Sequence, residues 1–183
     1  MKYFYIHGLN STGERTVKEL SRVLKTKVIG LDWKTELCYR TNVENMQEQI
    51  ESYREDDFVI IGSSMGGFYA RILSNVLKVP CVLFNPVTDV RKAYENIKDI
   101  EFYSNLSKEL VDSYDLAMIS DITIPRLVVI GLNDTVINPN DTIETWKGRC
   151  NLITVDEGHQ IENFEPFKEA IEHLSIPLLY DAI

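Results

Sequence analysis

Short runs of consecutive apolar residues, rich in β-branched and aromatic side chains, recur along the 183-residue chain. A strand that is apolar at successive positions, rather than at every second one, is typical of a parallel sheet that is buried on both faces. The pattern predicts strands at residues 2–6, 28–31, 57–61, 79–84, 126–130 and 152–155.

The segments between these runs repeat apolar residues three and four positions apart, which is the spacing of an amphipathic helix. The first helix is expected to open with a capping box, in which Ser11 is the N-cap and Glu14 the third helical residue. Thr41 and Glu44 form the same pattern at the start of the next helix, which is expected to end near Arg54.

Later helices follow the same pattern. One comes directly after the third strand and is expected to end near Leu77. Another begins at Asn138-Pro139, because proline suits the first position of a helix. The last helix carries an apolar face made of Phe164, Phe167, Ala170, Ile171 and Leu174.

Strands and helices therefore alternate along the chain. This order predicts an α/β protein in which a doubly wound, mostly parallel sheet of about six strands has helices on both faces. Residues 1–183 are expected to form a single domain. In such a sheet the functional site lies beyond the carboxyl ends of the strands, so the residues that follow each strand are the candidates for chemistry.

The strand at 57–61 runs into Gly62-Ser63-Ser64-Met65-Gly66-Gly67 and then into a helix. A strand, a Gly-x-Ser-x-Gly turn and a helix form the context of a nucleophile elbow, with Ser64 at its apex. Glycine leaves room for the sharp turn, and the first amides of the helix stabilise negative charge. The alternative is a plain glycine-rich turn that opens a helix, either with or without a phosphate-binding role. No Gly-Lys-Ser/Thr follows, which argues against a P-loop.

A serine needs a base to act as a nucleophile, and the usual base is a histidine that a carboxylate orients. The chain has three histidines. His159 follows the sixth predicted strand, where a general base is expected. His173 lies inside the last helix and is interpreted as a solvated surface residue, whereas His7 belongs to the loop after the first strand. We expect His159 to be the base.

Asp134 follows the fifth predicted strand and is the candidate for the orienting acid. The chain order Ser, Asp, His is the one that α/β-hydrolases use. Asp89, after the fourth strand, is the more serious alternative, and Asp141 and Asp156 are less well placed. Asp134 is also open to a plainer interpretation, because Asn-Asp is a common turn pair.

A tetrahedral intermediate needs hydrogen-bond donors for its oxyanion. The Met65 amide, directly after the nucleophile, is expected to be one of them. The second is expected from the loop after the first strand, where the small Gly8 lets the backbone approach the substrate. We assign it to the Leu9 amide, with Asn10 as the alternative.

These motifs together resemble the small bacterial α/β-hydrolases of the YqiA/YcfP esterase type, over nearly the whole chain. The residues that carry the resemblance are His7-Gly8-Leu9-Asn10-Ser11, the 62–69 segment, Asn85-Pro86, Gly131-Leu132-Asn133-Asp134 and Gly158-His159. The resemblance implies a compact hydrolase fold and hydrolysis of small or acyl-chain carboxylic esters. By position, it implies Ser64 as nucleophile, Asp134 as acid and His159 as base, with no cofactor and no metal.

Composition limits the partners. The net charge of −9 counts against nucleic acid and anionic membrane surfaces as principal partners. No apolar run is long enough to span a membrane, and the N-terminal one is too short for a signal peptide. The odd number of cysteines, Cys38, Cys81 and Cys150, suggests reduced thiols and a cytoplasmic protein. The resemblance implies a small-molecule ester or thioester as the partner.

The segment at 87–125 is long for a single crossover and rich in apolar residues. It is interpreted either as a small cap that lines an acyl pocket or as ordinary helices packed on the sheet. Two functions remain beside the esterase. One is an acyl-CoA thioesterase, although the acidic chain is a mild argument against it. The other is a binding protein that keeps the hydrolase scaffold without its activity.

Overall fold

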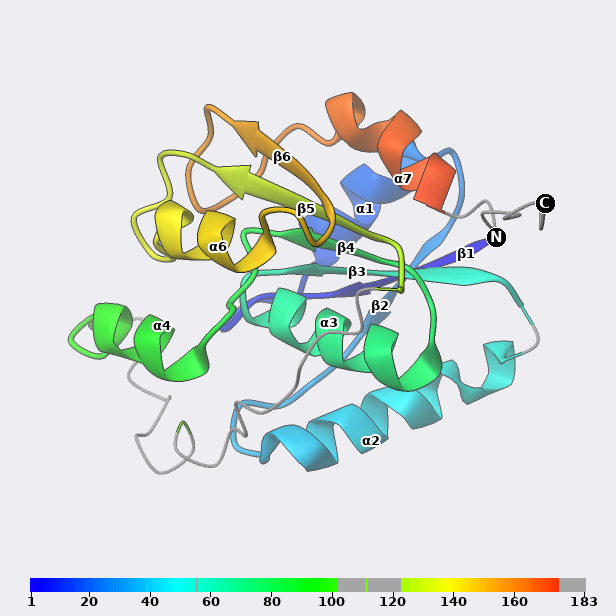
Figure 1. Cartoon of the computed structure of the whole chain (residues 1–183). Coiled ribbons are helices and arrows are strands. Elements are labelled where there is room, and N and C mark those ends of the chain that lie inside the picture. The colour runs from blue at the N-terminus through cyan, green and yellow to red at the C-terminus, as the bar shows by residue number, and fades with distance from the viewer. Residues whose placement is uncertain (55, 102–110, 112–122, 175–183) are drawn as a thin grey trace.

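The computed structural model describes residues 1–54, 56–101, 111 and 123–174. Within these ranges six strands form one parallel sheet in the order β2-β1-β3-β4-β5-β6 (Figure 1). The strands are β1 (Lys2–Ile6), β2 (Val28–Leu31), β3 (Phe58–Ser63), β4 (Cys81–Phe84), β5 (Arg126–Gly131) and β6 (Asn151–Val155). The predicted sheet is confirmed. The strands β1 and β2 match the expected ranges, and the other four differ from theirs by one or two residues at one or both ends.

Helices cover both faces of this sheet (Figure 1). They are α1 (Glu14–Val23), α2 (Tyr39–Ile50), α3 (Met65–Leu77), α4 (Val90–Ile97), α6 (Pro139–Trp146) and α7 (Lys168–Leu174), with short 3₁₀ turns η1 (Glu51–Tyr53) and η3 (Glu165–Phe167). The helices α1 and α7 lie on one face, and α2, α3, α4 and α6 contribute to the core on the other. The predicted doubly wound α/β architecture is therefore confirmed.

Two hydrophobic cores explain why the strands are apolar at successive positions. In β1, Phe4 and Ile6 are buried against the side that α2 and α3 cover. Tyr3 and Tyr5, which alternate with them, are buried on the side of α1 and α7. Because a strand directs successive side chains to opposite faces, a sheet covered on both faces needs an apolar residue at each position.

The helix α1 begins at Glu14, so the capping box expected at Ser11 is wrong. The residue before the helix is Gly13, whose φ of 72° lies in the left-handed region that favours glycine. Ser11 Oγ accepts a hydrogen bond from the Gly13 N–H at 3.1 Å. The chain thus turns at Gly13, which makes Glu14 the first helical residue instead of the third.

The second expected capping box is wrong for a different reason. The helix α2 begins at Tyr39, so Thr41 lies inside it, and Cys38 takes the capping position. The buried Asn42 side chain, one turn into the helix, binds the Lys34 backbone through both its oxygen and its nitrogen. These contacts tie the preceding loop onto the helix, so tertiary packing sets where α2 starts.

Other expected helix boundaries hold. Asn138 caps α6, with its side chain accepting from the Asn140 N–H at 3.0 Å and Pro139 at the first helical position. The turn η1 extends α2 as far as Tyr53, next to the expected end at Arg54.

The segment at 87–125 contributes α4, whose Val90 and Ile97 pack into the core on the α3 side. Several aromatic and apolar residues of this segment, on which its interpretation as an acyl-lining cap or as ordinary helices depends, lie outside the described residues. They are Phe102, Tyr103, Leu106, Leu110, Tyr114 and Met118.

Candidate active site

The strand β3 ends in a turn that presents Ser64 at the carboxyl edge of the sheet. Ser64 has φ of 54° and ψ of −121°, a combination that non-glycine residues rarely adopt. A side chain at Gly62 would collide with the backbone of Gly66, and one at Gly66 would collide with the carbonyl oxygen of Ile6. The sharp turn therefore packs directly against its own helix and against the end of β1.

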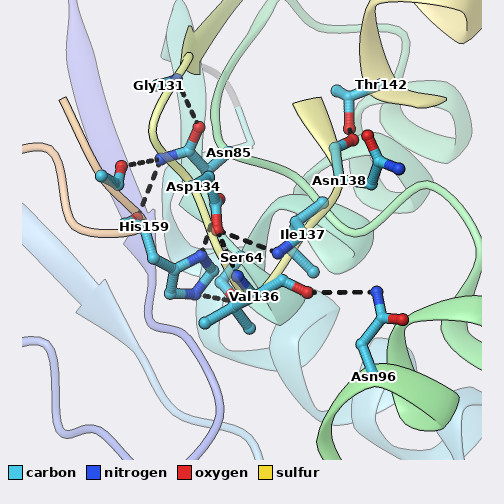
Figure 2. A network of polar contacts seen from close by, with 11 residues as sticks. Ser64, Asn85, Asn96, Gly131, Asp134, Val136, Ile137, Asn138, Thr142 and His159 are labelled. Atoms are coloured by element: carbon cyan, nitrogen blue, oxygen red, sulfur yellow. Dashed lines mark hydrogen bonds and ion pairs between the residues drawn. The ribbon is translucent and has the colours of Figure 1, made fainter. Parts of the chain in front are cut away.

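His159 reaches Ser64 from the loop after β6, and Asp134 reaches His159 from the loop after β5 (Figure 2). His159 Nε2 lies 3.1 Å from Ser64 Oγ, and His159 Nδ1 lies 2.8 Å from Asp134 Oδ2. An ionised carboxylate can only accept, so Nδ1 carries the proton of a neutral imidazole and Nε2 is left to accept from the serine hydroxyl. The structure thus brings together the three residues that the sequence nominated.

The Asp134 carboxylate is fully engaged. Its side chain is 1% exposed. Oδ2 faces His159, while Oδ1 accepts from the backbone N–H of Val136 at 2.8 Å and of Ile137 at 2.9 Å (Figure 2). A buried carboxylate needs such partners, because an uncompensated charge away from water is costly. These bonds hold the oxygen that faces the imidazole in one place.

The structure adds Asn85, which follows β4 and is 2% exposed. Its Nδ2 donates to the carbonyl oxygens of Gly158 and His159 at 2.9 Å each, and its Oδ1 accepts from the Gly131 N–H at 2.7 Å (Figure 2). Asn85 therefore links the loop that carries the acid to the loop that carries the histidine. The sequence shows that Asn85 follows a strand. It does not show the hydrogen-bond partners of Asn85, because these lie far from it along the chain.

The rival acids are occupied elsewhere. Asp89 caps α4 through the N–H groups of Arg91 and Lys92. Asp156 accepts from the Asn133 side chain at 2.7 Å, and Asp141 pairs with Lys92 at 3.5 Å. Of the four aspartates considered, Asp134 is the one bonded to a histidine.

The two remaining histidines have other surroundings. His173 is exposed on α7, as expected for a surface residue. His7 lies in the loop after β1, where its Nδ1 is 2.8 Å from the Gly8 carbonyl oxygen.

Both expected oxyanion donors lie near the nucleophile. A methyl group placed on Gly8 would be 3.2 Å from Ser64 Cβ, so glycine lets the loop touch the serine. The next residue, Leu9, lines the same cavity as Ser64, and its N–H donates to no residue that the structure describes. Met65 is the first residue of α3, and a first helical N–H has no partner within its helix.

A cavity of about 690 Å³ opens beside Ser64 and His159. Its walls come from the loop after β1, from the first turns of α1 and from the residues that follow His159. Uncharged polar side chains in the wall are Asn10, Ser11, Thr12, Thr16, Ser63 and Gln160, and apolar ones are Leu9, Phe84, Ile161 and Phe164. The described residues of 87–125 do not line this cavity.

Tyr5 lines the same cavity from β1. Its hydroxyl is hydrogen-bonded to Ser63 and Thr16. Burial raises the pKa of Tyr5, and these two hydrogen bonds partly counteract it. The phenol therefore stays neutral at physiological pH and can serve as a donor inside the cavity.

Within the described ranges, His, Cys, Asp and Glu form no group of three or more that could hold a metal ion. In the same part of the chain, none of the helices is both long and apolar enough to cross a bilayer.

A model of the family described as "Uncharacterised protein family (UPF0227)" matches residues 2–176. The chain belongs to this family. The resemblance to YqiA-like proteins noted in the sequence is thereby confirmed. Among curated proteins, none matches the sequence.

Solved structures similar to this chain share its fold at low sequence identity. A pyrethroid hydrolase from Sphingobium faniae JZ-2 has a TM-score of 0.73 and 12% identity, over 96% of this chain and 97% of that one. The monoacylglycerol lipase of Paleococcus ferrophilus has a TM-score of 0.60 and 14% identity, over 94% and 97%. An extracellular α/β-hydrolase from a Paenibacillus species has a TM-score of 0.60 and 14% identity, over 94% and 93%. The fold is that of the α/β-hydrolases.

Proposed function

We propose that this protein is a serine hydrolase that cleaves carboxylic esters through an acyl-enzyme. The observation that carries the proposal is the continuous hydrogen-bonded chain from Ser64 through His159 to the buried Asp134, with distances of 3.1 and 2.8 Å. A strained serine at a strand-to-helix turn, beside an open cavity, supports the same function. The similarity to a monoacylglycerol lipase is consistent with it, because monoacylglycerols are carboxylic esters.

The first half of the reaction acylates Ser64. His159 Nε2 takes the hydroxyl proton while Ser64 Oγ bonds to the ester carbonyl carbon, whose oxygen becomes an oxyanion. The N–H groups of Leu9 and Met65 donate to this oxygen. When the intermediate collapses, the C–O bond to the leaving alcohol breaks, and His159 gives its proton to the departing oxygen.

The second half releases the acid. His159 takes a proton from water, the resulting hydroxide adds to the acyl carbon, and collapse of the second intermediate returns the proton to Ser64 Oγ. Asp134 stays ionised throughout and stabilises the imidazolium that forms in each half. Its bonds to the Val136 and Ile137 amides suit that role, because they keep Oδ2 aimed at the ring.

The cavity favours a small or polar ester. Most of the uncharged side chains that line the cavity carry a hydroxyl or an amide group. A long acyl chain would instead need an extended apolar surface. The cavity's charged lining residues are Glu14, Glu19, Glu162, Arg15 and Lys18. Acidic residues outnumber basic ones there, which disfavours the phosphates of an acyl-CoA thioester. An oxygen ester therefore fits better than a CoA thioester.

The decisive experiment measures hydrolysis of p-nitrophenyl esters from acetate to palmitate, with wild type beside Ser64→Ala. We expect the rate to be highest for the short esters and to fall by about 10³-fold or more in Ser64→Ala. Ser21→Ala is a suitable control, because it removes a serine hydroxyl of α1 that does not line the cavity. Undiminished turnover in Ser64→Ala would contradict the proposal.

A fluorophosphonate probe and matched substrates separate the alternatives. The probe is expected to label wild type at Ser64 and to leave Ser64→Ala unlabelled. Absence of labelling in the folded wild type would favour a binding protein on a hydrolase scaffold. A higher rate on thioesters than on oxygen esters of the same acyl length would instead favour the thioesterase.

A further inference from the structure

Two ring side chains bind consecutive carbonyl groups of the loop beside Ser64. His7 Nδ1 lies 2.8 Å from the Gly8 carbonyl oxygen. Trp33 Nε1 donates to the His7 carbonyl oxygen at 2.9 Å. A carbonyl oxygen can only accept, so His7 Nδ1 must carry a proton. Two successive peptide groups of this loop are thus each held by a side-chain donor.

The first of these bonds bears directly on the Leu9 amide. The Gly8 carbonyl and the Leu9 N–H belong to the same peptide group, which is planar and trans. In such a group the C=O and the N–H point in opposite directions, so a bond that holds the carbonyl also fixes the direction of the N–H. A donor to the carbonyl also polarises the peptide group and strengthens its N–H as a donor.

Trp33 supports both the loop and the His7 ring. Its side chain is buried, with only 7% of the residue exposed. The indole stacks on the imidazole of His7, with ring centres 5.6 Å apart and planes 20° from parallel. The indole also contacts the ring of Tyr69 of α3, with ring centres 4.9 Å apart. The indole is therefore wedged between the loop and the helix that follows the nucleophile.

Asn42 of α2 anchors the segment that carries Trp33. Its Oδ1 accepts from the Lys34 N–H at 2.9 Å, and its Nδ2 donates to the Lys34 carbonyl at 2.8 Å. The same Nδ2 donates to the Tyr69 hydroxyl at 3.0 Å. Because Tyr69 lies on the helix that begins just after Ser64, the nucleophile and the loop that faces it share one buried support.

We propose that His7 and Trp33 are positioning residues of the oxyanion hole, which hold the Gly8–Leu9 peptide group so that the Leu9 N–H faces the oxyanion formed at Ser64. This inference rests on the proposed esterase function. It assigns a role to a histidine outside the Ser64–Asp134–His159 chain and to a residue of the β2–α2 loop, neither of which contacts the reacting atoms.

The first test replaces Trp33 by phenylalanine, which keeps a ring in the stack and removes the indole N–H. We expect kcat on p-nitrophenyl acetate to fall about tenfold with little change in KM, less than the roughly 100-fold expected when a donor is lost outright. The matched control is Trp146→Phe, because Trp146 is also buried and its Nε1 has no hydrogen-bond partner within the described residues. Its kcat is expected to equal that of wild type.

The second test uses His7. His7→Phe keeps the ring without the donor and is expected to lower kcat about tenfold. His7→Asn places an amide N–H at the equivalent δ position and is expected to restore kcat to within about threefold of wild type. A trifluoromethyl ketone, which forms a tetrahedral oxyanion adduct with a serine, is expected to lose affinity in the same proportion as kcat/KM.

The outcomes distinguish this inference from the proposed function. Wild-type turnover that survives Ser64→Ala would overturn the function, and the inference with it. Turnover that depends on Ser64 but is unchanged in Trp33→Phe and His7→Phe would overturn the inference alone. So would a fall in kcat that leaves the ketone affinity unchanged or that His7→Asn does not reverse, because either result would indicate a purely structural role.

Discussion

Buried polar groups at the two ends of the sheet have very different surroundings. At the carboxyl ends, Asp134 and Asn85 use both of their side-chain heteroatoms in hydrogen bonds. Toward the amino ends, the side chain of Arg71 on α3 is also buried, with only 9% of the residue exposed. Its Nε has no hydrogen-bond partner within the part of the chain that the structure describes.

Among the described neighbours of Arg71, Asp89 opposes its charge and Arg126 adds a like charge. Burial lowers the pKa of Arg71 to about 10, so the guanidinium remains charged at neutral pH. Its Cζ lies 5.4 Å from the centre of the Phe68 ring, a modest cation–π contact. Burial also raises the pKa of the nearby Cys81 thiol, which therefore stays neutral and supplies no opposing charge.

The comparison shows where side-chain orientation matters. A network in which the polar atoms are satisfied rigidifies its members, as a catalytic constellation requires. A buried charge with few partners contributes no such precision and lowers the stability of the fold. We therefore expect substitutions at the carboxyl ends to affect turnover and a substitution at Arg71 to affect stability alone.

The largest effect is expected for Asp134→Asn. The amide would present a donor to His159 Nδ1 and favour the imidazole tautomer whose Nε2 carries the proton and cannot accept from Ser64. By analogy with serine proteases, kcat should fall about 10³- to 10⁴-fold. The control is Asp156→Asn, a substitution at an exposed aspartate of the loop that precedes His159. Equal activity of the two variants in ester hydrolysis would refute the assignment of Asp134.

A smaller effect is expected for Asn85→Ala. The substitution leaves the Gly131 N–H and the carbonyls of Gly158 and His159 without their partner, so the free energy of unfolding should fall by about 1–3 kcal/mol. Displacement of the His159 loop should also lower kcat by about 10- to 100-fold. Urea denaturation and steady-state kinetics measure both effects. Asn133→Ala, at an exposed position, serves as the control. A wild-type kcat in Asn85→Ala would show that Asn85 does not position His159.

The smallest change in activity is expected for Arg71→Met, which removes the buried charge at similar volume. Turnover should match wild type, while the free energy of unfolding should rise by about 1–3 kcal/mol. Arg71→Lys keeps a buried cation and should give no gain. Lower stability of Arg71→Met than of wild type would contradict this account of the amino ends.

The sign of the pH dependence follows from the lowered pKa of Arg71. The folded state binds this proton less tightly than the unfolded state, so the penalty is fully present below about pH 10 and is relieved only above that pH. The stability gain of Arg71→Met should therefore be constant between pH 6 and pH 9 and should shrink above pH 10.

The order of strands and helices could be predicted because it depends on local patterns. Apolar runs and turn residues located the strands, and Ser64, Asp134 and His159 each lie in the turn or loop that follows a strand. Since parallel strands share one carboxyl edge, Ser64, Asp134 and His159 were expected to converge before any distance was known. The structure brings them within hydrogen-bonding distance.

The errors and omissions arose where a short sequence pattern does not report the backbone conformation or the tertiary contacts. The capping boxes at Ser11 and Thr41 matched a local pattern, but a left-handed Gly13 and the buried Asn42 set the helix starts. Trp33 lies in a polar loop whose sequence shows no link to the site. Its bond to the His7 carbonyl exists only because β2 lies beside β1 in the sheet.

The amino-acid sequence alone determined the alternation of elements, the elbow at Ser64 and the chain order of the serine, the acid and the histidine, because these depend on neighbours within a few residues. The tertiary structure decided which aspartate faces His159, how Asn85 and Trp33 tie loops together, and which loops line the cavity. These features depend on atoms that meet only after the strands have paired, since their partners lie dozens of residues apart.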